Sequence, residues 1–137
     1  MGRRALKITP DTNLFVRLFV DDDVTQRRLA EQALEGAELV GVTMPALCEL
    51  AWVLTRSYGL RRADVATAIR SLIDVANVVV DRPAVEAGLA ILDHGGDFAD
   101  GVIAHLGCEL GGDVFVSLDK KAVEIVEEVG AAALLLG

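Results

Sequence analysis

The chain has 137 residues, of which 53% are hydrophobic, so we predict one folded domain over residues 1–137 and exclude a disordered protein. No apolar run approaches the roughly 20 residues that span a bilayer. The basic start MGRRALKI lacks the apolar segment of a signal peptide, and we therefore expect a cytoplasmic protein with no membrane partner. The net charge of −8 argues against a protein that coats itself with nucleic acid, because Lys and Arg drive phosphate binding.

Short apolar runs alternate with longer amphipathic segments along the chain. The pattern predicts a strand at 5–9, a short helix at 12–20, and a helix at 23–36 that begins after an Asp and ends at a Gly. The expected elements after these are, in order, a strand at 38–43, helices at 45–59 and 61–76, a strand at 77–81, helices at 83–96 and 98–112, a strand at 113–118, a helix at 120–130 and a buried strand at 131–136. Apolar strands that alternate with helices predict an α/β fold whose parallel sheet is covered on both faces.

The cysteines and histidines do not form a metal-binding pattern. Cys48 and Cys108 lie in apolar helical segments without zinc spacing, so we expect both in the core. His94 and His105 share no ligand spacing with each other or with a cysteine, and we expect packing roles for both.

Five acidic residues stand where charges need an explanation. Asp11 and Asp119 follow apolar strands, Asp97 and Asp100 open the helix at 98–112, and Glu49 is the only charge within a long apolar segment. Each has an ordinary explanation. Asp11, Asp97 and Asp119 could each be the N-cap of a helix, and Asp100 could be a favourable charge near the positive end of one. Glu49 could lie on a small solvent-facing part of an otherwise buried helix.

Taken together, the five acids favour a metal site. Ligands bind beyond the carboxyl ends of the strands in open α/β sheets, and all five acids are candidates for that edge. Carboxylates that converge there repel one another unless a cation is bound. Oxygen ligands without Cys or His suit Mg²⁺ or Mn²⁺.

The same residues resemble the motifs of the PIN-domain nucleases, and most closely those of the VapC-type toxins of bacterial toxin–antitoxin pairs. DTN at 11–13 resembles the first motif and Glu49 in LCELAWVL the second acid. DFAD at 97–100 resembles the third motif and SLD at 117–119 the fourth. The resemblance covers nearly the whole chain. The chain departs from the usual motifs with Ser117 and Leu118 in place of Thr and Phe and with Gly101 in place of Ala, and none of these changes removes a ligand.

The resemblance implies a three-layer α/β/α sandwich around a parallel sheet of about five strands. It also implies an endoribonuclease, a hydrolase that cleaves RNA with metal-activated water and leaves a 5′-phosphate. The implied catalytic residues are Asp11, Glu49, Asp100 and Asp119. The implied metal ligands are Asp11, Asp97, Asp100 and Asp119, with Glu49 able to act through water and with Thr12, Asn13 and Ser117 holding the carboxylates in place.

The resemblance further implies biological partners. VapC-type toxins are homodimers, a cognate antitoxin protein inhibits them, and tRNA or ribosomal RNA is the usual target. The chain has four basic pairs that could contact RNA, namely Arg3–Arg4, Arg27–Arg28, Arg61–Arg62 and Lys120–Lys121. Lys120 and Lys121 are the strongest candidates because they follow Asp119 directly.

Three other functions compete with the nuclease. A haloacid-dehalogenase-like phosphatase needs a second Asp where Asn13 stands, and a phosphoacceptor receiver domain has no use for Glu49. A catalytically inactive PIN-like module could instead bind a protein through the helices at 23–36 and 61–76. Failure to bind a divalent metal would favour that module.

Overall fold

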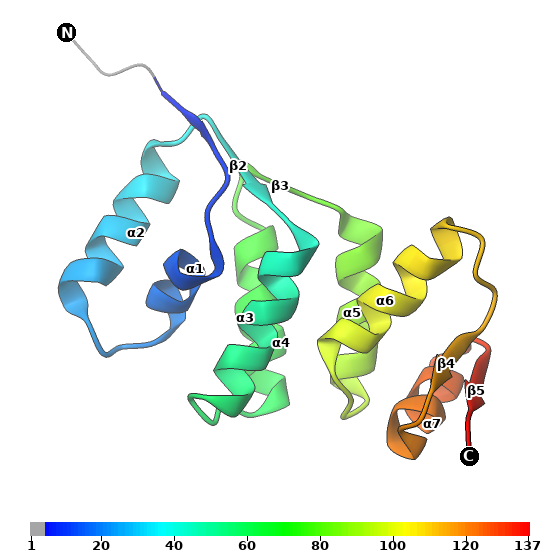
Figure 1. Ribbon diagram of the computed structural model, residues 1–137. Helices are drawn as coiled ribbons and strands as arrows, with labels where there is room; N and C mark the ends of the chain where they lie inside the picture. Colours follow the sequence, from blue (N-terminus) through cyan, green and yellow to red (C-terminus); the bar gives the residue numbers. More distant parts are fainter. Residues whose placement is uncertain (1–4) are drawn as a thin grey trace, which may run out of the picture.

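The computed structural model describes residues 5–137, which fold as an α/β protein with seven helices and five strands (Figure 1). The first half contains β1 (Lys7–Ile8), α1 (Thr12–Phe19), α2 (Val24–Gly36), β2 (Leu39–Val42), α3 (Met44–Arg56) and α4 (Arg62–Ile73). The second half contains β3 (Val78–Val80), α5 (Arg82–Asp93), α6 (Phe98–Glu109), β4 (Phe115–Ser117), α7 (Lys120–Glu128) and β5 (Ala133–Leu135). The expected element types and their order are confirmed. The basic pair Arg3–Arg4 lies outside the described residues.

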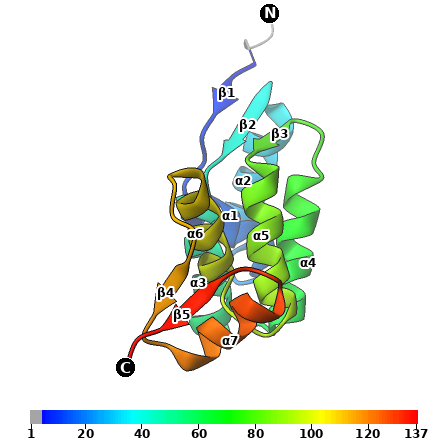
Figure 2. The same ribbon diagram turned by 90° about the vertical axis from the view of Figure 1, so that its right-hand side faces the viewer.

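All described strand pairs are parallel, as expected, but they form two sheets rather than one. Three strands pair in the order β1-β2-β3, and β4 pairs only with β5. Val40 in the central strand stands opposite Val78, and Phe115 stands opposite Ala133. Figures 1 and 2 show β4, β5 and α7 at the opposite end of the molecule from β1.

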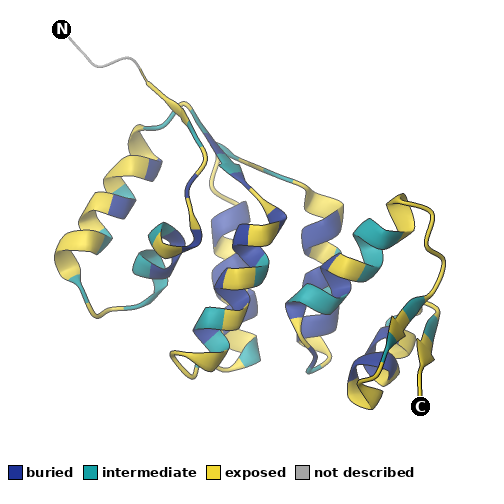
Figure 3. Ribbon diagram, in the orientation of Figure 1, coloured by how far each residue is buried: buried dark blue, intermediate teal, exposed yellow. Residues whose placement is uncertain are grey.

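The main core is formed mostly by helices. Phe15, Leu47, Leu50, Ile69 and Phe98 are among its largest fully buried side chains. Buried positions gather on the facing sides of α3, α4 and α5, whereas β4 and β5 are largely exposed (Figure 3). A second, small cluster joins Ile91 of α5 to Ile125 and Val126 of α7.

The expectation of a sheet covered on both faces, with a buried last strand, is wrong for β4 and β5. Val116 and Leu134 are 50% and 51% exposed. The physical reason is the division of the sheet: α7 packs against this strand pair, while Val116 borders an open pocket between β4 and Ile103 of α6. Cys108 is also exposed rather than buried in the core, and Cys48 is half-buried.

The α5 and α6 helices approach each other unusually closely. A Cβ atom at Gly101 of α6 would lie 2.2 Å from the carbonyl oxygen of Ala87 in α5. A Cβ atom at Gly88 would overlap the ring of Phe98. Glycine at both positions therefore permits this packing, which fixes the start of α6 and the acids that lie there.

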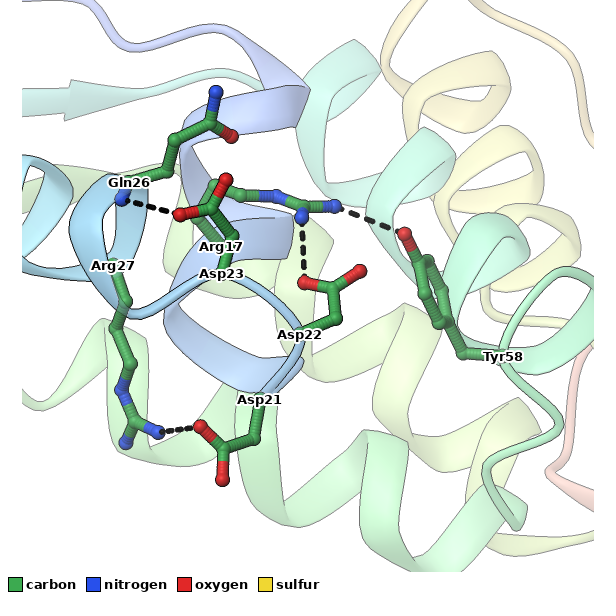
Figure 4. Close-up of polar contacts among 7 residues, drawn as sticks. All are labelled: Arg17, Asp21, Asp22, Asp23, Gln26, Arg27 and Tyr58. Atoms are coloured by element: carbon green, nitrogen blue, oxygen red, sulfur yellow. Dashed lines mark hydrogen bonds and ion pairs between the residues drawn. The ribbon is translucent and has the colours of Figure 1, made fainter.

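A polar corner links the end of α1 to the turn after α3 (Figure 4). The Arg17 guanidinium donates to the Asp22 carboxylate at 2.6 Å and to the Tyr58 hydroxyl at 2.9 Å. The hydrogen bonds to Tyr58 and Asp22 raise the pKa of Arg17. A second ion pair, Arg27 with Asp21 at 3.4 Å, lies at the start of α2. These contacts set the position of α1 relative to α3.

The histidines contact their own helices, and the described helices do not suit a membrane. His94 Nδ1 lies 2.8 Å from the Ala90 carbonyl oxygen, and His105 Nε2 lies 3.2 Å from a Glu109 carboxylate oxygen. Within residues 5–137, no helix is both long and apolar enough to cross a bilayer.

Candidate active site

Five aspartates occupy helix N-cap positions in residues 5–137, and they differ in how their carboxylates are used. Four accept a hydrogen bond from the backbone of their own helix: Asp11, Asp23, Asp81 and Asp119. Asp11 accepts from the Leu14 amide at 3.1 Å, which confirms its capping role. The fifth, Asp97, makes no such bond.

The carboxylate of Asp97 is contacted by Arg62 and not by a backbone amide of its own helix. A guanidinium nitrogen of Arg62 lies 3.5 Å from Asp97 Oδ1, and its Nε donates to the Gly96 carbonyl at 3.0 Å. Arg62 is the first residue of α4, so this pair connects the start of α4 to the start of α6. The carboxylate of Asp97 therefore remains free of the capping bond that its position would allow.

Asp100 has a carboxyl group with a raised pKa at this end of the fold. Its side chain is half-buried in the first turn of α6. Burial raises its pKa, and the negative charges of Asp97 and Asp119 raise that pKa further. Three of the predicted site acids are therefore close enough for Asp100 to respond to the other two.

Ser117 and the first turn of α7 hold Asp119. The Asp119 amide donates to Ser117 Oγ at 3.0 Å, and its carboxylate accepts from the Lys121 amide at 3.0 Å. The capping explanation for Asp119 is therefore confirmed. Ser117 contacts the backbone of Asp119 and not its carboxylate, so its expected role in holding that carboxylate stays a prediction.

Asp11 and Glu49 do not complete a cluster in this structure. Among residues 5–137, no group of three or more His, Cys, Asp or Glu side chains is close enough to hold a metal ion. Asp11 follows β1 and Asp119 follows β4, and these strands lie in separate sheets, so the argument from a shared sheet edge does not join them. Glu49 is exposed, which agrees with the ordinary explanation that it lies on a solvent-facing part of an otherwise buried helix.

The other predicted residues differ in their surroundings. Thr12 is buried and Asn13 is exposed at the start of α1. Lys120 and Lys121 are exposed, and Lys120 Nζ lies 3.9 Å from a Glu124 carboxylate oxygen. Both lysines are accessible to an anionic ligand, and their contact with RNA stays a prediction.

The family model of the PIN domain matches residues 8–128 of the chain, and this range includes all the candidate acids. The chain belongs to the PIN domain family. PIN domains are in general nucleases that use divalent metal ions. No curated protein matches the chain at a significant level. The resemblance at the level of the family is thus confirmed, and the closer likeness to VapC-type toxins stays a prediction.

The acids of this PIN domain suit a divalent cation by their chemistry. Asp97, Asp100 and Asp119 offer only carboxylate oxygens, which Mg²⁺ and Mn²⁺ prefer. Burial and, after it, repulsion by Asp97 and Asp119 raise the pKa of Asp100, and a bound cation would offset both effects by stabilising the ionised carboxylate. These residues therefore suit a metal by donor type and by charge, although their side chains, as placed in residues 5–137, do not lie close enough together to hold one.

Sequence reasoning missed the contact between Arg62 and Asp97. The two residues are 35 positions apart, and no local pattern joins them. The absence of Lys and Arg next to DFAD was the only available signal, because paired carboxylates at a helix start need a positive partner from elsewhere in the chain.

Proposed function

We propose that this PIN domain is a Mg²⁺- or Mn²⁺-dependent endoribonuclease that hydrolyses phosphodiester bonds in RNA. The observation that carries the proposal is the match to the PIN domain family over residues 8–128, within which Asp97 and Asp100 line one cleft of the domain. Burial and the charges of Asp97 and Asp119 also raise the pKa of Asp100, and a carboxyl group perturbed in this way is typical of sites built for a cation or for catalysis. In a PIN domain, this cluster is the natural candidate for the nuclease centre.

The residues of the cluster have distinct proposed roles. Asp100 and Asp119 bind the metal with Asp97 beside them, and Ser117 holds Asp119 through its backbone. Asp11 and Glu49 are proposed as further site acids on the resemblance of their motifs. A bound divalent ion lowers the pKa of water towards neutrality and so supplies hydroxide for attack on phosphorus. The exposed ion pair of Arg62 with Asp97, at 3.5 Å, reduces the repulsion among the acids only in part in the protein without metal.

RNA cleavage by matched variants tests the proposal. The purified protein is incubated with total tRNA and ribosomal RNA in Mg²⁺, Mn²⁺ or EDTA, and the ends of the products are mapped. We expect discrete metal-dependent cuts that leave 5′-phosphates. Asp100→Asn removes a first-turn charge inside the cluster, and Asp64→Asn removes a first-turn charge from α4 as the control.

The two variants should behave differently. We expect Asp100→Asn to abolish cleavage and Asp64→Asn to retain it. Cleavage by Asp100→Asn at the parent rate would contradict the assignment of the site. If the parent protein neither cleaves RNA nor binds a divalent ion, a catalytically inactive protein-binding module becomes the better explanation.

We further propose that the nuclease is the toxin of a toxin–antitoxin pair. The order and spacing of the DTN, Glu49, DFAD and SLD motifs support this finer proposal. It predicts a homodimer, a small antitoxin that binds the protein, and tRNA or ribosomal RNA as the target. Light scattering of the purified chain tests the dimer. Growth arrest on expression of the parent, but not of Asp100→Asn, tests the toxin role.

A further inference from the structure

A shallow cleft between α3 and α6 adjoins the acidic cluster. Trp52 and Arg56 of α3 line one part of it, and Arg62, Asp97 and Asp100 line another. Its volume is about 110 Å³, whereas pockets that enclose small molecules hold several hundred Å³. The cleft is therefore too small to enclose a ligand, but it can serve as an open platform beside the acids.

Trp52 lies on the exposed side of α3, which also carries Glu49 and Arg56. Leu47, Leu50 and Leu54 of α3 are fully buried, while Trp52 is 61% exposed. Trp52 is also the only tryptophan in the chain. A large aromatic ring left mainly in water contributes little to the core, and its faces are available for stacking.

Two arginines, Arg56 and Arg62, line the same cleft as Trp52. Arg56 lies four positions after Trp52 and so on the same side of the helix. Within residues 5–137, Arg56 makes no ion pair and no side-chain hydrogen bond, while Arg62 pairs with Asp97 at a long 3.5 Å. The cleft therefore has one guanidinium with no described partner and a second whose ion pair is weak and solvent-exposed.

We propose that this cleft is a nucleotide subsite for single-stranded RNA, in which a base stacks on Trp52 and a phosphate pairs with Arg56. The inference rests on the proposed nuclease function and adds a means of holding the substrate. Proteins that bind single strands combine positive side chains along the backbone with aromatic rings under the bases. Since Asp97 and Asp100 line the same cleft, the subsite holds the strand next to the acids that would cut it.

Binding without cleavage tests the subsite separately from catalysis. The anisotropy of a short, labelled, single-stranded oligouridylate is measured in EDTA with the full chain. Loss of one stacked base weakens binding roughly 5- to 150-fold, and we expect this for Trp52→Ala. Trp52→Phe should recover part of the affinity. Leu29→Ala is the control, because Leu29 is also 61% exposed and lies on α2.

The arginine and the intrinsic fluorescence provide further readouts. Arg56→Ala should weaken binding and reduce the slope of log affinity against log salt by about one. The fluorescence of Trp52 in the parent should be quenched as the oligonucleotide binds. Parent affinity in Trp52→Ala, or unchanged fluorescence during binding, would overturn the subsite. Fluorescence that responds to an acidic peptide but not to RNA would overturn it as well.

These results distinguish the subsite from the nuclease. Trp52-dependent binding by a parent that cleaves no RNA supports the subsite and refutes the nuclease. Metal-dependent cleavage with equal affinities in parent and Trp52→Ala supports the nuclease and refutes the subsite.

Discussion

Replacing Gly101 with Ala tests the close packing of α5 on α6. The added Cβ would lie 2.2 Å from the Ala87 carbonyl oxygen and 2.8 Å from the Gly88 Cα. Both are backbone atoms, so neither can turn away as a side chain would. A carbon and a carbonyl oxygen on packed backbones normally stay about 3.3 Å or more apart. The helices must therefore separate by roughly 1 Å at this point, or the backbone must distort.

Two opposing effects determine the magnitude. Ala is the better helix former, and this alone would stabilise the protein by up to about 1 kcal/mol. Overpacking a tight contact costs about 1–3 kcal/mol, and a clash with rigid backbone lies at the upper end of that range. The expected net loss in the free energy of unfolding is about 1–2 kcal/mol, or a thermal midpoint lower by roughly 4–8 °C.

Urea unfolding followed by circular dichroism measures the difference, with Gly107→Ala as the control. Gly107 lies in the same helix, and a Cβ there meets no atom within 4 Å. Gly107→Ala should therefore gain stability from helix propensity alone. If Gly101→Ala proves as stable as Gly107→Ala, then the contact between the helices is looser than the structure shows and the reasoning is refuted.

Three further predictions concern charge. Burial and two neighbouring aspartates raise the pKa of Asp100, so the folded state holds the carboxyl proton more tightly than the unfolded chain does. The protonated carboxyl group therefore contributes stability at low pH, and this contribution is lost as the pH rises through the raised pKa of the folded state. In EDTA, Asp100→Asn should therefore raise the urea midpoint more at pH 7 than at pH 4, and an equal gain at both pH values would contradict this. Mg²⁺ at 100 times its dissociation constant should stabilise the parent by about 2.7 kcal/mol, an effect that EDTA reverses and that Asp100→Asn lacks in thermal melts. Arg17→Ala removes the contacts to Asp22 and Tyr58 and should lower the urea midpoint. The control Arg28→Ala changes an exposed arginine with no described partner and should leave the midpoint unchanged. Equal midpoints in the two variants would show that the polar corner around Arg17 adds no stability.

Local patterns were sufficient to predict the elements, and their errors lie at the helix ends. Helices expected to reach residues 59, 96 and 112 end at Arg56, Asp93 and Glu109. In each case only one or two residues lie between the last helical residue and a glycine with positive φ, such as Gly95 at 87°. In α5 and α6 that glycine directly follows the C-cap residue and so ends the helix, and the expected ends were each three residues too late.

Strand pairing and the arrangement of the acids depend on contacts distant in sequence. The apolar run in β4 indicates a strand, but it does not say whether that strand joins β1 or only β5. The half-burial of Asp100 was readable from the apolar residues around it. The partner of Asp97 could not be predicted from local sequence, because Arg62 lies on a different helix.

The two hydrophobic clusters divide the candidate acids between them. Asp97 and Asp100 lie on α6, whose Phe98 and Val102 belong to the large core. Asp119 begins α7, which packs in the small cluster of Ile91, Ile125 and Val126. Small clusters open locally at a lower free energy than a whole domain. On heating, Asp119 should therefore leave its neighbours while most helices remain folded, and RNA cleavage should be lost at a lower temperature than the circular dichroism signal.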